Sequence, residues 1–349
     1  MSLESKNFRL KRGAGVLLPI SSLPSNYGIG TFGKESFKFV DFLERIGCSY
    51  WQVLPIGPTS YGDSPYQSFS AFAGNPYFID LDILVDEKLL KQEEINVFKW
   101  QITEDKVDYG LIFNSRVKIL KTAFLRSQHS NQRDFMEFCE KNEYWLDDYS
   151  LYMAVKTYFN HHEWLLWDDD IKNYQPEAIV KYKNLLKSDV DFWKFVQYKF
   201  YEQWDKLKQY ANSKGIRIIG DIPLYVAMDS ADVWAHNELF ELDERKNPIN
   251  VAGVPPDLFS EYGQRWGNPL YRWDVMEKEN FVWWRERMKA SAALYDVIRI
   301  DHFIGIVNYY SIPAKCPTAV EGCWREGPGK KLTDIIINAV GDTKIIAED

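Results

Sequence analysis

The chain has 349 residues, 46% of them hydrophobic and 26% charged, which is an ordinary composition for a globular protein with a large core. Its 42 basic and 50 acidic residues give a net charge of −8 without a long basic run, which argues against nucleic acid as a partner. No stretch is apolar over a membrane-spanning length, and no apolar core of a signal peptide is evident, so we expect a cytoplasmic protein.

Residue usage also bears on cofactors and ligands. The four cysteines form no CxxC pair, no histidine cluster accompanies them, and no loop of alternating acids is present, so we expect neither a metal nor another cofactor. Aromatic residues make up 16% of the chain, with 13 Trp and 21 Tyr. This abundance fits a carbohydrate ligand, although most of the rings are expected to fill the core.

The first elements predict a strand–helix–strand unit. Residues 15–20 and 50–56 are short apolar runs that indicate buried strands. Between them, four apolar residues at helical spacing are followed by Gly47, which suits a helix C-terminus. The four are Phe39, Phe42, Leu43 and Ile46.

A long loop follows at 57–76, in which small hydroxyl residues alternate with aromatic ones. Such a loop after a strand is either a binding surface or a loop held in place by its own rings. From about 84 to 200 glycine becomes rare, and we expect a mostly helical insertion. A helix around 192–213 returns the chain to the sheet, because five large apolar residues there follow helical spacing.

Three short apolar runs end in a carboxylate. Residues 216–220 lead into Asp221, 297–300 into Asp301, and 345–347 into Glu348. One such acid is more often a loop or helix cap. Three in series suggest acids that meet at the carboxyl edge of parallel strands, where barrel enzymes assemble their chemistry.

Arg299 precedes Asp301 by two positions, so both side chains are expected on one face of the strand. A nearby guanidinium would favour the ionised carboxylate and depress the pKa of Asp301, although a purely structural ion pair is an equal alternative. Glu348 follows an apolar strand, and desolvation would raise its pKa. These environments would favour an ionised Asp301 and a protonated Glu348.

The segment 251–269 is rich in Gly and Pro and carries Phe259, Tyr262 and Trp266. It is predicted to be a loop that forms a lid or gate over the cleft.

The pattern favours an α/β fold, a (β/α)₈ TIM barrel with a helical insertion, present here only through about strand five. We expect three parts: 1–83 with the first βα units, 84–200 as the inserted subdomain, and 201–349 with strands three to five and the gate. The remaining βα units are expected after residue 349, since five strands would leave two edges unpaired. A complete open α/β fold is the alternative.

Several longer motifs resemble the 4-alpha-glucanotransferase family, also called amylomaltases or disproportionating enzymes. The resemblance runs from about residue 13 to the last residue and is weakest in the helical insertion. Its motifs are SPYQSFSAFAGNP at 64–76, GDIP at 220–223, GVPPD at 253–257, QRWGNP at 264–269, RIDH at 299–302 and IIAED at 345–349.

The resemblance implies a retaining enzyme of the α-amylase type that moves a segment of an α-1,4-glucan to the 4-OH of another glucan or of glucose. Asp301 would be the nucleophile and Glu348 the general acid/base, with carboxyls about 5–5.5 Å apart. Asp221 and Arg299 would support them. The residues implied in sugar binding are Ser64, Tyr66, Asp257, His302, Trp266 as the gate aromatic and Tyr61 in an outer glucan groove.

Two other functions stay open at this stage: an α-glucan hydrolase with the same acids, and a non-catalytic glucan-binding protein on the same fold. The resemblance also implies a third carboxylate, an Asp in a His-Asp pair beyond residue 349. We therefore expect the 349-residue chain by itself to be inactive.

Overall fold

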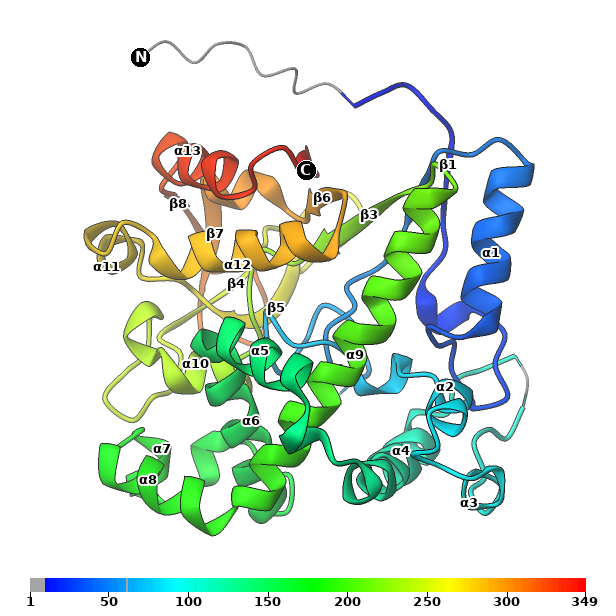
Figure 1. Cartoon of the computed structure of the whole chain (residues 1–349). Helices are drawn as coiled ribbons and strands as arrows, with labels where there is room; N and C mark the ends of the chain where they lie inside the picture. Colours follow the sequence, from blue (N-terminus) through cyan, green and yellow to red (C-terminus); the bar gives the residue numbers. More distant parts are fainter. Residues whose placement is uncertain (1–9, 61, 104) are drawn as a thin grey trace.

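The computed structural model of the chain describes residues 10–60, 62–103 and 105–349. Within this part, a five-stranded parallel sheet has the order β1-β2-β3-β6-β9 (Figure 1). Its strands are β1 Gly15–Leu17, β2 Tyr50–Gln52, β3 Arg217–Ile222, β6 Val297–Ile300 and β9 Lys344–Ala347. All five predicted strands are confirmed. β1 and β2 are shorter than predicted and end before Pro19 and Pro55, which have no N–H to continue a ladder.

Helices separate successive strands of this sheet. They are α1 Lys34–Arg45, α9 Lys187–Ser213, α12 Val282–Leu294 and α13 Lys330–Ala339. Gly47 has φ +75° after α1, so the predicted glycine stop is confirmed. The predicted apolar stripe of α1 is only partly buried, because Phe42 and Ile46 are exposed.

The region expected to be mostly helical contains seven α-helices in its described part, ahead of α9. They are α2 Leu81–Asp86, α3 Gln92–Asn96, α4 Tyr109–Arg126, α5 Arg133–Lys141, α6 Glu143–Tyr158, α7 Asp169–Lys172 and α8 Pro176–Leu185. The long helix α9 runs from these helices back to β3 (Figure 1). Its buried stripe includes Trp193, Phe200 and Trp204, as the helical spacing predicts. The limits of 84–200 as a subdomain remain a prediction.

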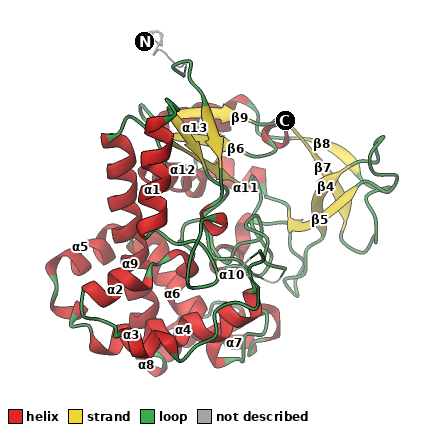
Figure 2. Ribbon diagram, turned by 90° about the vertical axis from the view of Figure 1, so that its right-hand side faces the viewer, coloured by secondary structure: helices red, strands yellow, loops and turns green. Residues whose placement is uncertain are grey.

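A second sheet was not predicted. It is antiparallel, with the order β5-β4-β7-β8, and stands apart from the parallel sheet (Figure 2). Its strands are β4 Asn250–Val254, β5 Gln264–Pro269, β7 Asn308–Pro313 and β8 Cys323–Glu326.

The prediction that 251–269 is a loop was therefore wrong, because this segment is the β4–β5 hairpin with a tip at 255–263. Its glycines serve strand pairing and the turn. A Cβ atom at Gly253 would lie 2.1 Å from the carbonyl oxygen of Gln264, and Gly263 has φ +65°.

The remaining described elements are short. They are α10 Ala231–Ala235, α11 Trp273–Lys278, and the 3₁₀ turns η1 Ile20–Ser22, η2 Pro76–Phe78, η3 His129–Asn131, η4 Trp164–Leu166, η5 Asn237–Leu239 and η6 Phe303–Ile306. No helix among the described residues has the length and apolar character needed to cross a membrane.

Candidate active site

The three predicted acids meet at one guanidinium, which confirms that they converge. Nη1 of Arg299 lies 2.7 Å from Oδ1 of Asp221 and 3.2 Å from Oδ1 of Asp301. Nη2 of Arg299 lies 3.2 Å from Oε1 of Glu348. The strand register explains the meeting, since Asp221 pairs with Arg299 across β3 and β6, and Arg299 pairs with Ile346 of β9. Residues at even spacing then share one face.

Backbone hydrogen bonds between the ends of β6 and β9 fix Glu348. Its N–H donates to the carbonyl of Ile300 at 3.1 Å, and its carbonyl accepts from the N–H of Phe303. Its carboxylate accepts from the N–H of His302 at 3.0 Å, and His302 has a left-handed backbone with φ +53°. A non-glycine residue in this conformation is uncommon and is concentrated at functional sites.

Asp221 is the most deeply buried of the three acids, with a side chain only 1% exposed. Besides the contact with Arg299, it accepts a hydrogen bond from the Tyr66 hydroxyl at 2.8 Å. Burial, followed by the charge of Asp221, raises the pKa of the Tyr66 phenol, which therefore stays a donor. Tyr66 thus connects the 57–76 loop to the carboxylates. Ser64 lies within the same turn, and its Oγ accepts from the N–H of Tyr66 at 3.3 Å.

The electrostatics differ from the sequence-based expectation for Asp301. Burial raises the pKa of Asp301, and the neighbouring charge of Asp221 raises it further, while Arg299 lowers it only in part. The expectation that Arg299 depresses this pKa was wrong in its net direction, since the sequence shows the cation but not the burial. Burial is also the largest reason why the pKa of Asp221 is raised.

Aromatic rings border the carboxylates on the side of the antiparallel sheet. Trp266 of β5 meets the His302 ring edge-on with centroids 4.9 Å apart. The ring of Tyr225 lies 6.5 Å from that of His302 and 6.3 Å from that of Trp266. Nε2 of His302 is buried without a partner among the described residues, and burial lowers the pKa of His302. A neutral imidazole there can exchange a hydrogen bond with a ligand.

One predicted site residue that the structure describes, Asp257, is not brought to the carboxylates. Asp257 is exposed in the hairpin tip, where Oδ1 accepts from the N–H groups of Phe259 at 2.8 Å and Ser260 at 2.7 Å. These bonds hold the tip turn. Tyr61 lies outside the described residues. Tyr225 was missed by the sequence reasoning, although an aromatic residue four positions after Asp221 at a strand end could have signalled it.

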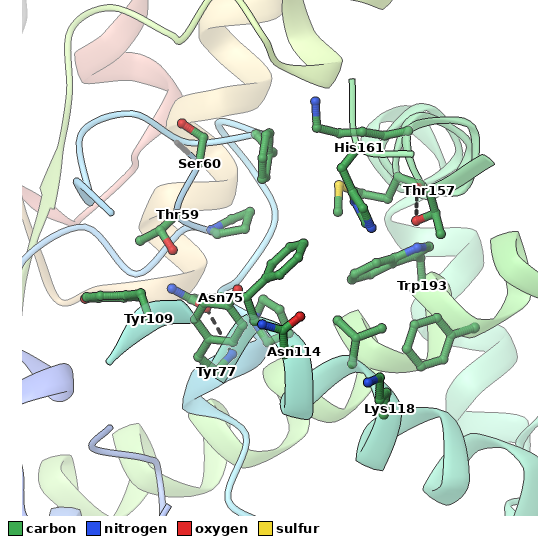
Figure 3. A pocket seen from close by; sticks show the side chains of 18 of the residues that line it. Thr59, Ser60, Asn75, Tyr77, Tyr109, Asn114, Lys118, Thr157, His161 and Trp193 are labelled. Carbon is green, nitrogen blue, oxygen red and sulfur yellow. Dashed lines mark hydrogen bonds between the residues drawn. The ribbon is translucent and has the colours of Figure 1, made fainter. Parts of the chain in front are cut away.

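A cavity of about 690 Å³ lies elsewhere, between the 57–76 loop and helices α4, α6 and α9. Figure 3 shows Thr59 and Ser60 on one side of it and Thr157, His161 and Trp193 on the other. None of the acids that contact Arg299 lines it. Among the described residues no cluster of His, Cys, Asp and Glu is arranged to hold a metal ion.

Comparisons with known proteins agree with this geometry. A family model described as 4-alpha-glucanotransferase matches residues 18–349. The 4-alpha-glucanotransferase of Clostridium butyricum is 53% identical over 331 residues, which span 95% of this chain and 68% of that protein. The 4-alpha-glucanotransferase of Thermus thermophilus is 47% identical over 344 residues, which span 97% of this chain and 68% of that protein.

The fold matches a solved structure as well. The amylomaltase from Streptococcus agalactiae, solved in complex with acarbose, aligns with a TM-score of 0.93 and 43% sequence identity. The alignment covers 97% of this chain and 69% of the Streptococcus chain. The α/β fold described above is therefore the one found in that amylomaltase.

Proposed function

The chain belongs to the 4-alpha-glucanotransferase family, and from this premise we propose which of its residues cleave the donor glucan, which protonate it and which receive the acceptor. The single observation that supports the assignment is the contact of Arg299 with Asp221, Asp301 and Glu348 at once. Because one guanidinium contacts three carboxylates from three strands, we take the space between these carboxylates to be about as large as one glycosidic linkage.

Asp301 is the nucleophile of a retaining double displacement. Its ionised carboxylate attacks the anomeric carbon of an α-1,4-glucan, and the bond to the leaving oxygen breaks as Glu348 donates a proton to that oxygen. In the second step Glu348, now ionised, takes the proton from the 4-OH of the acceptor, and that oxygen displaces Asp301. The support for this pairing is that Asp301 and Glu348 contact different nitrogens of one guanidinium.

Asp221 and Arg299 support the pair formed by Asp301 and Glu348. Arg299 offsets the like charges of carboxylates held close together. Asp221 holds Arg299 on one side and Tyr66 on the other. His302 offers its unpartnered Nε2 to a sugar hydroxyl, and Tyr66 presents its ring beside the reacting sugar.

Transfer needs the glycosyl-enzyme to meet a sugar before water does. Trp266 stands at the mouth of the site against His302, where its indole face can stack on an acceptor ring and exclude water. The acceptor is a second glucan or glucose. Asp257 and the exposed hairpin tip would close over the sugar only when it is bound.

We propose that the outer glucan groove expected at Tyr61 is the cavity of about 690 Å³. Its neighbours Ser60 and Gly62 line that cavity, together with Tyr109 and Phe113 of α4. Tyrosine and phenylalanine rings beside hydroxyl and amide side chains are a chemistry suited to sugar rings.

We also propose that the five parallel strands are part of a (β/α)₈ barrel. The support is their all-parallel order, the helices between them, and the acids at their carboxyl ends. The cytoplasm is the proposed compartment, supported by four cysteines that are all unpaired, as in a reducing environment.

The experiment that tests the function follows an isotopically labelled glucose acceptor and a maltooligosaccharide donor by NMR. The expected result is label at the reducing end of longer glucans, joined by new α-1,4 bonds, with the total number of glycosidic bonds unchanged. A falling number of glycosidic bonds without labelled glucan would instead identify a hydrolase, and new bonds in the β configuration would contradict a retaining mechanism.

A further inference from the structure

We propose that Asn268 is a positioning residue for the transfer half of the reaction. It ties together the three segments that bring Trp266, Tyr225 and Tyr66 to the site. This inference rests on the proposed function and deepens it, because it names a residue on which capture of the acceptor depends.

The bonds of Asn268 cross three segments that are far apart in the chain. Asn268 lies on β5 and is 5% exposed. Its Nδ2 donates to the carbonyl of Val226 at 2.8 Å. Its Oδ1 accepts from Nε2 of Gln67 at 3.1 Å. Both the nitrogen and the oxygen of the side-chain amide are therefore hydrogen-bonded, which fixes the orientation of the side chain.

Each segment that Asn268 joins carries a ring of the candidate site. Gln67 follows Tyr66, whose hydroxyl donates to Asp221. Val226 follows Tyr225, whose ring lies between those of Trp266 and Tyr271, at centroid distances of 6.3 and 6.0 Å. Asn268 itself follows Trp266 by two strand positions. One amide thus sets the relative position of three rings around the sugar.

The antiparallel sheet depends on side-chain hydrogen bonds of this kind for its attachment to the body of the protein, because part of its hydrophobic core is separate from the main core. Five buried residues of β4, β7 and the connection from β7 to β8 form a hydrophobic cluster separate from the main core. They are Val251, Tyr310, Ile312, Cys316 and Ala319. The tip of its hairpin is solvent-exposed, with Leu258 and Phe259 fully accessible. Buried polar bonds such as those of Asn268 are costly to leave unmade and therefore hold the hairpin to the body of the protein.

The 57–76 loop has other anchors. Ser60 and Gln67 are joined by a backbone hydrogen bond, and Ala71 donates to the carboxylate of Asp232 at 2.8 Å. The contacts of Arg299 with the acids come from directly paired strands. Loss of the Asn268 amide is therefore expected to release the hairpin and Trp266, while the groups that cleave the donor stay in place.

The test uses a glycosyl fluoride as the donor, because fluoride is a small leaving group that does not occupy the acceptor side. The first-turnover burst of fluoride reports formation of the glycosyl-enzyme, because later turnovers also need its breakdown, and transfer to added maltose reports capture by the acceptor. The variants are Asn268→Ala and Asn268→Asp in the full-length enzyme. Aspartate keeps an acceptor for Gln67 but cannot donate to the carbonyl of Val226.

We expect fluoride release without acceptor to stay within about twofold of wild type. The KM for maltose should rise by roughly tenfold in Asn268→Asp, which loses one buried hydrogen bond, and by at least as much in Asn268→Ala, which loses two. The hydrolysed share of product rises accordingly. The matched control is Asn250→Ala on β4, which removes an amide that donates to Glu241 at 3.0 Å on the same sheet. The control should leave the KM for maltose unchanged.

A second variant keeps the test decisive if the Asn268 variants fail to fold. Gln67→Ala removes only the bond between the loop and Asn268, and it should raise the KM for maltose in the same direction by a smaller factor. Faster amide hydrogen exchange over 264–268 in Asn268→Ala, with exchange at 297–300 unchanged, would support release of the hairpin.

A KM for maltose within twofold of wild type in both Asn268→Ala and Gln67→Ala overturns the inference, and so does an equal fall in fluoride release and transfer. The proposed function fails separately, if Asp301→Asn still releases fluoride at the wild-type rate.

Discussion

The two sheets contribute to the site in different ways. The parallel sheet places Asp221, Arg299 and Glu348 through the backbone pairing of β3, β6 and β9. The antiparallel sheet brings Trp266 to the same place, but it has a hydrophobic cluster of its own and is joined to the carboxylate side by side-chain amides. The groups proposed to cleave the donor and the ring proposed to meet the acceptor should therefore respond to mutation separately.

The largest effect is expected from Asp301→Asn, which removes the proposed nucleophile. Its kcat should fall by on the order of 10⁴-fold or more in steady-state assays of the full-length enzyme. Asp334→Asn, an acid paired with Lys330 on the surface of α13, is the matched control and should keep wild-type kcat. Activity of Asp301→Asn within tenfold of wild type would exclude Asp301 as the nucleophile.

The same substitution should raise the melting temperature. The pKa of Asp301 is raised in the folded protein, so its ionised form destabilises the fold, and stability is lost as pH rises from the ordinary value of about 3.9 through the folded pKa. Differential scanning calorimetry at pH 7 should show a higher Tm for Asp301→Asn, and the gain should vanish at a pH below that ordinary value. A lower Tm at pH 7 would contradict the raised pKa.

The next largest effect is expected from Arg299→Lys. A single ammonium cannot contact Asp221, Asp301 and Glu348 in the geometry of a guanidinium, so kcat should fall by roughly 10²- to 10³-fold and stability by about 2–4 kcal/mol. Arg325→Lys, in an ion pair with Glu241 at 3.1 Å, is the control and should change neither quantity appreciably. Unchanged urea unfolding of Arg299→Lys would show that Arg299 does not hold the acids together.

A smaller and more selective effect is expected from Trp266→Ala. Hydrolysis relative to transfer should rise by about tenfold, because one lost stacking contact weakens acceptor binding without altering the carboxylates. Trp324→Ala, a half-exposed ring on β8 of the same sheet, should leave the ratio unchanged. Chromatography of products from maltotriose measures both outcomes, and an unaltered ratio in Trp266→Ala would remove this residue from the gate.

The smallest expected effect is a shift in the pH dependence of kcat/KM. The charge of Asp221 helps to raise the pKa of Asp301, so Asp221→Asn should lower that pKa and move the acid limb of kcat/KM to lower pH. A glycosyl fluoride donor lets the residual rate be followed, since its departure needs little help from Glu348. A shift to higher pH would mean that the acid limb reports another group.

The two sheets also differ in how far the sequence predicts them. The parallel strands could be located because a run of buried β-branched residues followed by an acid is a local pattern, as at 297–301. The antiparallel sheet was missed because Gly253 and Gly267 break the alternation of its strands and were taken as signs of a loop.

Long-range contacts explain the other errors. Gln67 and Asn268 are 201 residues apart, and nothing near either residue in the sequence indicates their bond. The charge of Arg299 was visible in the sequence, but the burial that outweighs it at Asp301 depends on the packed fold. The positions of side chains could be predicted where they follow from spacing along the sequence. They could not be predicted where they depend on contacts between distant parts of the folded chain.

The most direct test of the central claim is a crystal structure of the full-length enzyme after reaction with a fluorinated glycosyl fluoride, which slows breakdown of the glycosyl-enzyme. The account predicts a covalent bond from an Asp301 carboxylate oxygen to the anomeric carbon, with Glu348 within hydrogen-bond distance of the departing side and Arg299 still in contact with Asp221. A sugar bonded to any other residue, or bound with Asp301 and Glu348 on opposite sides of the protein, would contradict it.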